Sequence, residues 1–203
     1  MYSLSGNRQL PYIPNLLIIG GASRNVGKTS LILHLIEEYR RTFPVTCIKV
    51  TSVRQDEQRF HGNHPNLRGN DFSVKEETSV LGHKDTCRML KAGADRVFYI
   101  ETPDHLISRA FSSFLQQAAP NGPLICESRH LRRIVRPGLF LLLRHFDQTL
   151  IKPDFETYER LADLVVTIPE QASGPAYLAD KIQWNGTRWL LKNDTAGPVG
   201  KDQ

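Results

Sequence analysis

The chain has 203 residues, a charged fraction of 23% and a hydrophobic fraction of 40%, as expected for one globular domain over residues 1–203. Its three cysteines are widely spaced and form no CxxC pair, which argues against a secreted disulfide framework and favours a cytoplasmic protein. No apolar run reaches the roughly 18 residues of a membrane span, so no membrane partner is expected. The net charge of +5 suits an anionic ligand.

The first part of the chain predicts a strand, a glycine loop, a helix and a second strand. Residues 16–19 (LLII) are a short apolar run that leads directly into the loop. Residues 29–41 carry apolar side chains at helical spacing, and the β-branched residues of 45–51 indicate a strand. The polar residues 52–80 are expected to form a long loop, and a loop of this length in a compact domain is usually functional or disordered.

Helices and strands continue to alternate in the middle of the chain. A helix is expected over 84–92 and a strand over 96–100 (RVFYI). The next helix is expected over 104–118, because the preceding Thr-Pro pair is typical of a helix start. Two further apolar strands follow at 123–127 and 138–143.

The C-terminal part predicts a helix over 153–162, a strand over 164–168 and a hairpin over 182–191. The hairpin is indicated by Asn185-Gly186, a two-residue turn sequence between alternating segments. Apolar strands that alternate with helices favour an α/β fold in three α/β/α layers with a mostly parallel sheet.

The stretch GGASRNVGKTS, residues 20–30, has the composition of a phosphate-binding loop between a strand and a helix. Backbone N–H groups of such a loop and the following helix N-terminus attract phosphate. Lys28 is expected to reach the outer phosphates, and the Thr29 hydroxyl is expected to bind Mg²⁺. The strict pattern GxxxxGK[ST] is missed by one position, because Ala22 stands at its first glycine and Gly21 comes one residue earlier. The predicted phosphate-binding residues are Gly21, Ser23, Arg24, Asn25, Val26, Gly27, Lys28, Thr29 and Ser30.

Two further residues are candidates for catalysis together with Lys28. Glu127 ends an apolar strand and is the best carboxylate to hold Mg²⁺ beside the loop, the alternative being a glutamate that faces solvent. Lys49 lies inside an otherwise apolar strand, where a lysine is costly unless it is paired or serves a site. Near the carboxyl end of that strand it would face the ligand crevice of an open α/β sheet.

The segment SRHLRRIVR, residues 128–136, places five basic side chains directly after the Glu127 strand. One interpretation is a solvated turn whose arginines pair with surface acids. The other is a second anion site for a phosphorylated substrate, for which Arg129 and Arg132 are the chosen residues because guanidinium groups suit phosphate.

These motifs resemble known families. GASRNVGKT (21–29) is similar to the phosphate loop of dethiobiotin synthetases, and residues 16–143 resemble molybdopterin-guanine dinucleotide biosynthesis protein B (MobB) in motif order. CIKVT (47–51) stands where that family has a lysine motif such as IKHT. HKDTCRMLKAGAD (83–95) matches its KDS-type motif, and ICES (125–128) matches its VEG motif with a serine in place of the glycine.

The resemblance implies a P-loop NTPase fold in which Asp85 helps to hold magnesium and Lys49 faces the terminal phosphate or the substrate. It implies a Mg²⁺-dependent, GTP-binding accessory factor of molybdenum cofactor biosynthesis that acts with a nucleotidyltransferase. A small-molecule kinase or ATP-dependent ligase of the dethiobiotin-synthetase type is the first alternative, and a non-catalytic nucleotide sensor is the second.

The sequence does not identify the nucleotide base or the partner, and several other motifs are weak. ATP and GTP are not distinguished, because no NKxD-type motif is present, and a homodimer or a phosphorylated small-molecule partner stays open. No RNP-type or helix-turn-helix signature supports a nucleic-acid partner. Trp184 and Trp189 are expected to pack across the hairpin, and His61 with His64 is a weak alternative zinc pair.

Overall fold

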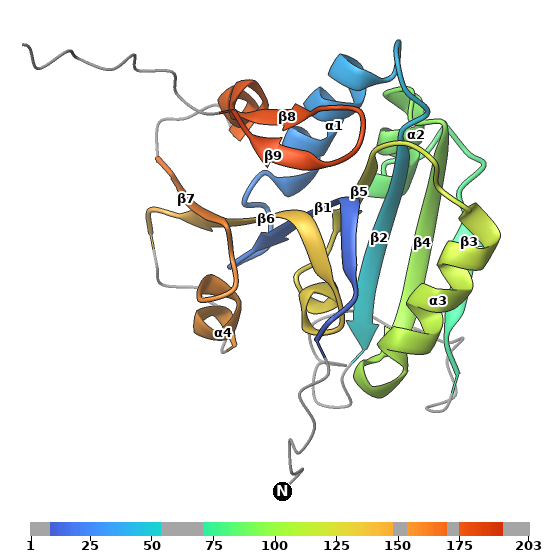
Figure 1. The fold of residues 1–203 in the computed structure, drawn as a ribbon. Helices are drawn as coiled ribbons and strands as arrows, with labels where there is room; N and C mark the ends of the chain where they lie inside the picture. Colours follow the sequence, from blue (N-terminus) through green and yellow to red (C-terminus); the bar gives the residue numbers. More distant parts are fainter. Residues whose placement is uncertain (1–8, 54–70, 148–153, 170–174, 193–203) are drawn as a thin grey trace, which may run out of the picture.

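The computed structural model describes residues 9–53, 71–147, 154–169 and 175–192, which form an α/β fold (Figure 1). Within these ranges a seven-stranded sheet has the order β3-β4-β2-β5-β1-β6-β7, and β8 and β9 form a separate two-stranded hairpin. All neighbours in the large sheet pair in parallel except β3, which runs antiparallel to β4 at one edge. The expectation of a mostly parallel sheet with a C-terminal hairpin is therefore confirmed.

Four strands, β1, β2, β4 and β6, are longer than the apolar runs that predicted them, because residues beyond those runs also pair with neighbouring strands. The bounds of the described strands are β1 Tyr12–Gly21, β2 Thr46–Val53, β3 Ser73–Glu76, β4 Arg96–Pro103, β5 Leu124–Glu127, β6 Arg136–His145, β7 Leu164–Ile168, β8 Ile182–Trp184 and β9 Trp189–Leu191.

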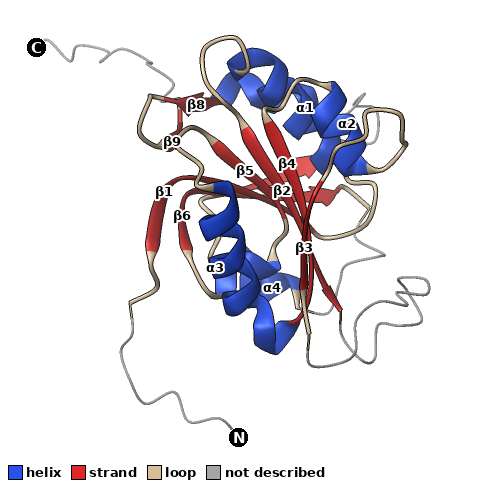
Figure 2. Ribbon diagram, turned by 90° about the vertical axis from the view of Figure 1, so that its right-hand side faces the viewer, coloured by secondary structure: helices blue, strands red, loops and turns tan. Residues whose placement is uncertain are grey.

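Four α-helices of the described residues cover the two faces of the sheet: α1 Lys28–Tyr39, α2 Asp85–Lys91, α3 Ile107–Ala118 and α4 Phe155–Glu159. Figure 2 shows α1 and α2 on one side of the sheet and α3 and α4 on the other. This division follows from right-handed crossovers, since the chain moves outward from β1 through β2 to β4 and then returns to β5 and β6. The result is a three-layer α/β/α arrangement with one apolar core on each face.

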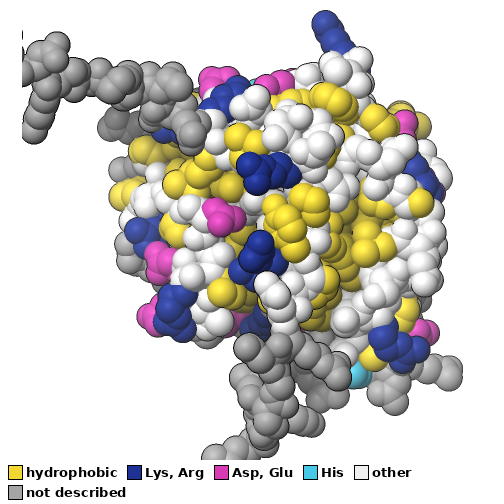
Figure 3. All heavy atoms as spheres, in the orientation of Figure 1, with side chains coloured by type: hydrophobic (Ala, Val, Ile, Leu, Met, Phe, Trp, Pro, Cys, Tyr) yellow, Lys and Arg dark blue, Asp and Glu magenta, His cyan; other side chains and the backbone are white. Residues whose placement is uncertain are grey.

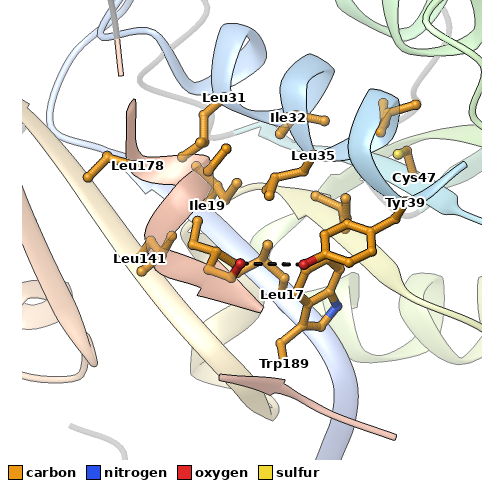
Figure 4. Packing of buried hydrophobic residues seen from close by; sticks show 14 of the residues in the cluster. Leu17, Ile19, Leu31, Ile32, Leu35, Tyr39, Cys47, Leu141, Leu178 and Trp189 are labelled. Atoms are coloured by element: carbon orange, nitrogen blue, oxygen red, sulfur yellow. Dashed lines mark hydrogen bonds between the residues drawn. The ribbon is translucent and has the colours of Figure 1, made fainter. Parts of the chain in front are cut away.

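The core beneath α1 also holds the C-terminal hairpin in place (Figure 4). Leu31 and Leu35 of α1 pack with Leu17 of β1, and Trp189 of the hairpin packs edge-on against Tyr39 with ring centroids 5.3 Å apart. The Tyr39 hydroxyl accepts a hydrogen bond from the Trp184 backbone N–H at 3.1 Å and donates one to the Ile182 carbonyl at 3.4 Å. Both tryptophans are buried, so the expectation of cross-strand packing is confirmed.

Two expectations from the sequence require correction. β2 continues to Val53 and β3 occupies Ser73–Glu76, so these parts of the expected 52–80 loop are strands; residues 54–70 lie outside the described range. A polar edge strand becomes recognisable only through its pairing partner, here β4. The helix expected over 153–162 is limited to Phe155–Glu159, because Leu161 and Ala162 make three-residue turn hydrogen bonds that lead into β7.

The surface seen in Figure 3 exposes hydrophobic side chains between the hairpin and α3, with single lysine or arginine side chains among them. The positive charge of the chain is therefore not gathered on this face. Among the described helices, none has both the length and the apolar composition that a membrane crossing requires.

Candidate functional site

The glycine loop, residues 21–27, joins the end of β1 to the first turn of α1. Asn25 and Gly27 have positive φ values of 57° and 88°, which turn the chain sharply into α1. A Cβ atom on Gly21 would lie 2.7 Å from Val26 Cγ1 and 3.2 Å from Lys28 Nζ, so this position has no room for a side chain. Ala22 is buried, and its N–H donates to the Leu143 carbonyl of β6 at 2.8 Å. Gly21 thus permits the close approach of Val26 and Lys28 to the loop backbone. In the strict pattern GxxxxGK[ST] the first glycine stands one position later, where this chain has Ala22.

A cavity of about 550 Å³ opens over this loop at the carboxyl ends of β1, β2 and β5. α1 leaves β1 on one face of the sheet, and the chain after β5 leaves on the other face, which creates the crevice where ligands bind in open α/β folds. Of the predicted phosphate-binding residues, seven line the cavity: Gly21, Arg24, Asn25, Gly27, Lys28, Thr29 and Ser30. Val26 instead packs in the core, and the Ser23 carbonyl accepts a hydrogen bond from Lys28 Nζ at 3.5 Å.

Four predicted site residues from separate elements meet at the wall of this cavity. The Thr29 hydroxyl donates to Glu127 Oε2 at 3.0 Å, although the two residues are 98 positions apart. Lys49 Nζ is hydrogen bonded to Asp85 and lies 3.4 Å from Glu127 Oε1. Lys49 is level with Glu127 in the β2–β5 register, so a residue in the middle of β2 faces the end of β5. The structure therefore brings Thr29, Lys49, Asp85 and Glu127 together as one cluster.

The ionisation of the cluster follows from its burial and its mixed charges. Burial lowers the pKa of Lys28, and Glu127 only partly opposes this effect. Burial also acts to lower the pKa of Lys49, but the adjacent carboxylates of Glu127 and Asp85 outweigh it and raise the pKa. Burial opposes ionisation of Asp85, yet its hydrogen bond and ion pair with Lys49 lower its pKa. Asp85 is therefore held as a carboxylate and Lys49 as an ammonium.

The donor set fits Mg²⁺ better than it fits a transition metal. Mg²⁺ is commonly held by one or two carboxylates together with phosphate oxygens and water. The Thr29 hydroxyl and the Glu127 carboxylate, whose oxygens are 3.0 Å apart, are oxygen ligands of the kind that Mg²⁺ prefers. Asp85 is connected to them by Lys49, which is hydrogen bonded to both Asp85 and Glu127. Among the described residues no group of three or more His, Cys, Asp or Glu side chains converges. His61 and His64 lie outside the described residues.

Arg129 and Arg132 do not share a site, so the predicted pair is separated. The Arg129 side chain is only 4% exposed, where it is paired with Asp154 and donates to the Gly21 carbonyl at 3.4 Å. Its guanidinium also lies over the Tyr158 ring, 5.3 Å from the centroid. Arg129 lines the cavity and connects the glycine loop, through Gly21, to α4, through Asp154 and Tyr158. We call this connection the Arg129 clamp.

Arg132 lies outside that cavity. It donates to the Val135 carbonyl at 3.2 Å and lines a separate hollow of about 300 Å³ near the start of β6. Arg132 lies within the 3-10 turn of residues 130–133, whereas Arg129 precedes this turn and is held by Asp154. The structure therefore does not bring Arg129 and Arg132 together in one cavity.

Sequence reasoning missed several residues that line the cavity. Arg88 lies one turn after Asp85 on α2 and is 3.5 Å from its carboxylate, a spacing that could have identified it. Ser52, Ser128 and His130 also line the cavity; Ser128 and His130 lie in segments that the sequence marked, but none of the three was chosen as a site residue.

Within the cavity lining, five lysine or arginine side chains face two carboxylates: Arg24, Lys28, Lys49, Arg88 and Arg129 against Asp85 and Glu127. This excess of positive charge, together with backbone N–H groups at the start of α1, suits a polyanionic ligand. Comparisons of the chain with protein-family models, curated proteins and solved structures give no match.

Proposed function

We propose that this protein is a P-loop protein that binds a nucleoside triphosphate with Mg²⁺ in the cavity over the glycine loop. The observation that carries the proposal is the hydrogen bond of 3.0 Å between Thr29, at the start of α1, and Glu127, at the end of β5. A hydroxyl directly after the loop lysine and a carboxylate from the neighbouring strand are the groups that would hold the metal of a bound triphosphate.

The roles of the other residues follow from their positions. Lys28 would contact the outer phosphates, because its ammonium lies within the curve of the loop beside Gly21. Lys49 would face the terminal phosphate from the opposite wall, next to Glu127. Mg²⁺ would neutralise part of the triphosphate charge and polarise the terminal phosphoryl group.

The resemblance of residues 16–143 to MobB leads us to propose a GTP-binding accessory role in molybdenum cofactor biosynthesis, with a nucleotidyltransferase as partner. A transfer enzyme of the dethiobiotin-synthetase type is the second candidate. It is favoured by the cavity, whose volume of about 550 Å³ extends beyond the glycine loop to β2 and α2. A sensor that binds nucleotide without turnover is the third reading of the same site.

Calorimetric titration of Lys28→Ala with GTP and ATP, each with and without Mg²⁺, tests the common core of these proposals. Affinity for the preferred nucleotide should fall at least about tenfold, or about 1.4 kcal/mol, because a point charge on phosphate is lost. Lys91→Ala, a change of the exposed lysine that ends α2, is the matched control and should leave the affinity unchanged.

The outcome that would overturn the proposal is equal binding by folded Lys28→Ala and wild-type protein. The same titrations identify the base, since the preferred nucleotide binds with the lower dissociation constant. Turnover that requires a small acceptor would favour the transfer enzyme. Nucleotide-dependent association with a purified nucleotidyltransferase would favour the accessory role.

A further inference from the structure

One face of the sheet is polar where an open α/β sheet is normally apolar. On the α3 side, the side chains of β2, β4 and β3 are apolar and join the core: Ile48, Val50, Val74, Phe98 and Ile100. On the α1–α2 side, only the amino-terminal parts of β2 and β4 are apolar, where Cys47 and Val97 pack with Met89 of α2. The α2 helix covers only these amino-terminal parts, and the carboxyl ends of β2 and β4 extend beyond it (Figure 1).

Beyond α2, the next two levels of the register on this face carry only hydrogen-bonding side chains, and the last level is the apolar pair Val53 and Pro103. Register places Lys49 opposite Tyr99 and Thr51 opposite Glu101 between β2 and β4. Between β4 and β3, Ser73 stands opposite Glu101 and Lys75 opposite Tyr99. Directly opposed residues share a face of the sheet, so these side chains form two rows across three strands. The polar patch consists of Lys49, Thr51, Ser73, Lys75, Tyr99 and Glu101.

The patch is continuous with the cavity, because Lys49 and Thr51 belong to both. Glu101 is 8% exposed, although it carries a carboxylate in a strand that has neighbours on both sides. The Ser73 hydroxyl is buried and makes no hydrogen bond within the described part of the chain. Burying polar groups on a sheet face costs free energy, so a core requirement does not explain them.

We propose that the polar patch is the acceptor subsite of the nucleotide site and that it takes a small neutral or cationic molecule bearing hydroxyl or amino groups. This inference rests on the proposed function. Lys49 is already held by Asp85 and Glu127. The recognition chemistry of the patch is therefore that of three hydroxyls and one buried carboxylate, with the exposed ammonium of Lys75 at the edge strand β3.

The buried carboxylate at the centre of the patch selects this ligand class, since Lys49 is already paired and the Lys75 ammonium is exposed on the edge strand β3. The Glu101 carboxylate repels a second polyanion and accepts hydrogen bonds from hydroxyl or ammonium groups. In a transfer, the acceptor oxygen or nitrogen would form a bond to the γ-phosphorus while the bond to the β-phosphate oxygen breaks. The nucleoside diphosphate would leave, and the acceptor proton would pass to solvent. Lys49, between the patch and the cavity, marks the place where acceptor and terminal phosphate would meet.

Amide chemical shifts of the ¹⁵N-labelled full chain provide the test, recorded with Mg²⁺ and a non-hydrolysable nucleoside triphosphate. The probes are ethanolamine, D-glucosamine and myo-inositol, with D-glucose 6-phosphate as the anionic comparison. At least one of the first three should shift the amides of Thr51, Tyr99 and Glu101. Its affinity should fall at least fivefold in Tyr99→Phe and in Glu101→Gln, so the test survives if one variant fails to fold. Glu37→Gln, an exposed change on α1, is the control and should bind as wild type does.

Two results would overturn the inference: no shift of these amides with any of the three probes, or tighter binding of glucose 6-phosphate than of glucosamine at the patch. Nucleotide affinity is measured first by calorimetry, which separates this inference from the proposed function. A chain that binds no nucleotide refutes the proposed function, and this inference falls with it. A chain that binds nucleotide but shows no probe at the patch refutes this inference alone.

Discussion

The substitution Gly27→Ala should destabilise the fold through two separable effects. Gly27 precedes α1 with φ at 88°, a left-handed conformation that costs a residue with a Cβ atom about 1–2 kcal/mol. The new Cβ would also lie 2.4 Å from Cδ and 2.8 Å from Cγ of Pro175, so the proline ring or the loop must move. Such overpacking costs about 1–3 kcal/mol. The expected total of about 2–5 kcal/mol is a large part of the roughly 5–15 kcal/mol that stabilises a typical domain.

Gly186→Ala is the matched control, because Gly186 has φ at 93° but a Cβ there would meet no atom within 4 Å. It should lose only the backbone contribution of about 1–2 kcal/mol. Urea unfolding of the two variants isolates the contact with Pro175 as their difference, expected at about 1–3 kcal/mol. The double variant Gly27→Ala/Pro175→Ala should recover part of that difference. Equal losses in the two single variants would refute the close packing of Pro175 on the glycine loop.

Three further experiments test residues of the site. Glu127→Gln should lower nucleotide affinity in the presence of Mg²⁺ at least about tenfold, while affinity without Mg²⁺ changes little. Calorimetry that shows equal losses of affinity with and without Mg²⁺ would mean that Glu127 has a structural role. Arg129→Ala should cost about 3 kcal/mol in urea unfolding, because it breaks a buried ion pair, and Arg132→Ala should cost clearly less; the reverse order would contradict the clamp. Asp85 has a lowered pKa beside Lys49, so its contribution to stability is present above about pH 4 and is lost as the pH falls through its folded-state pKa. Asp85→Asn should therefore flatten the decline in unfolding free energy below pH 4, and an unchanged decline would count against the ion pair.

The order of helices and strands could be predicted from the sequence because their signals are local. The apolar run before the glycine loop, the β-branched residues around Ile48 and the Asn185-Gly186 turn each act within a few residues of chain. The strand β3 could not be predicted, since Ser73–Glu76 is stabilised by pairing with β4 more than by its own composition. The same holds for the end of β2 at Val53, which has β4 as its partner.

The residues of the candidate site were also predicted in part. Lys28, Thr29, Lys49 and Glu127 stand out in the sequence, as a motif or as charged residues at apolar strands, and the structure collects them around one cavity. Arg129 and Arg132 look equivalent in the sequence because both are arginines in one basic segment. The structure separates them, since the turn after β5 directs one to Asp154 and the other to the Val135 carbonyl.

The sequence by itself determined the alternation of elements, the glycine loop and the types of charged residue available, because these depend on neighbours along the chain. Only the tertiary structure decided that Thr29 meets Glu127, that Pro175 covers Gly27 and that Tyr99 and Glu101 share a polar face with Thr51. Contacts of this kind depend on strand order and register, and a shift of one residue in register would turn each side chain to the opposite face of the sheet.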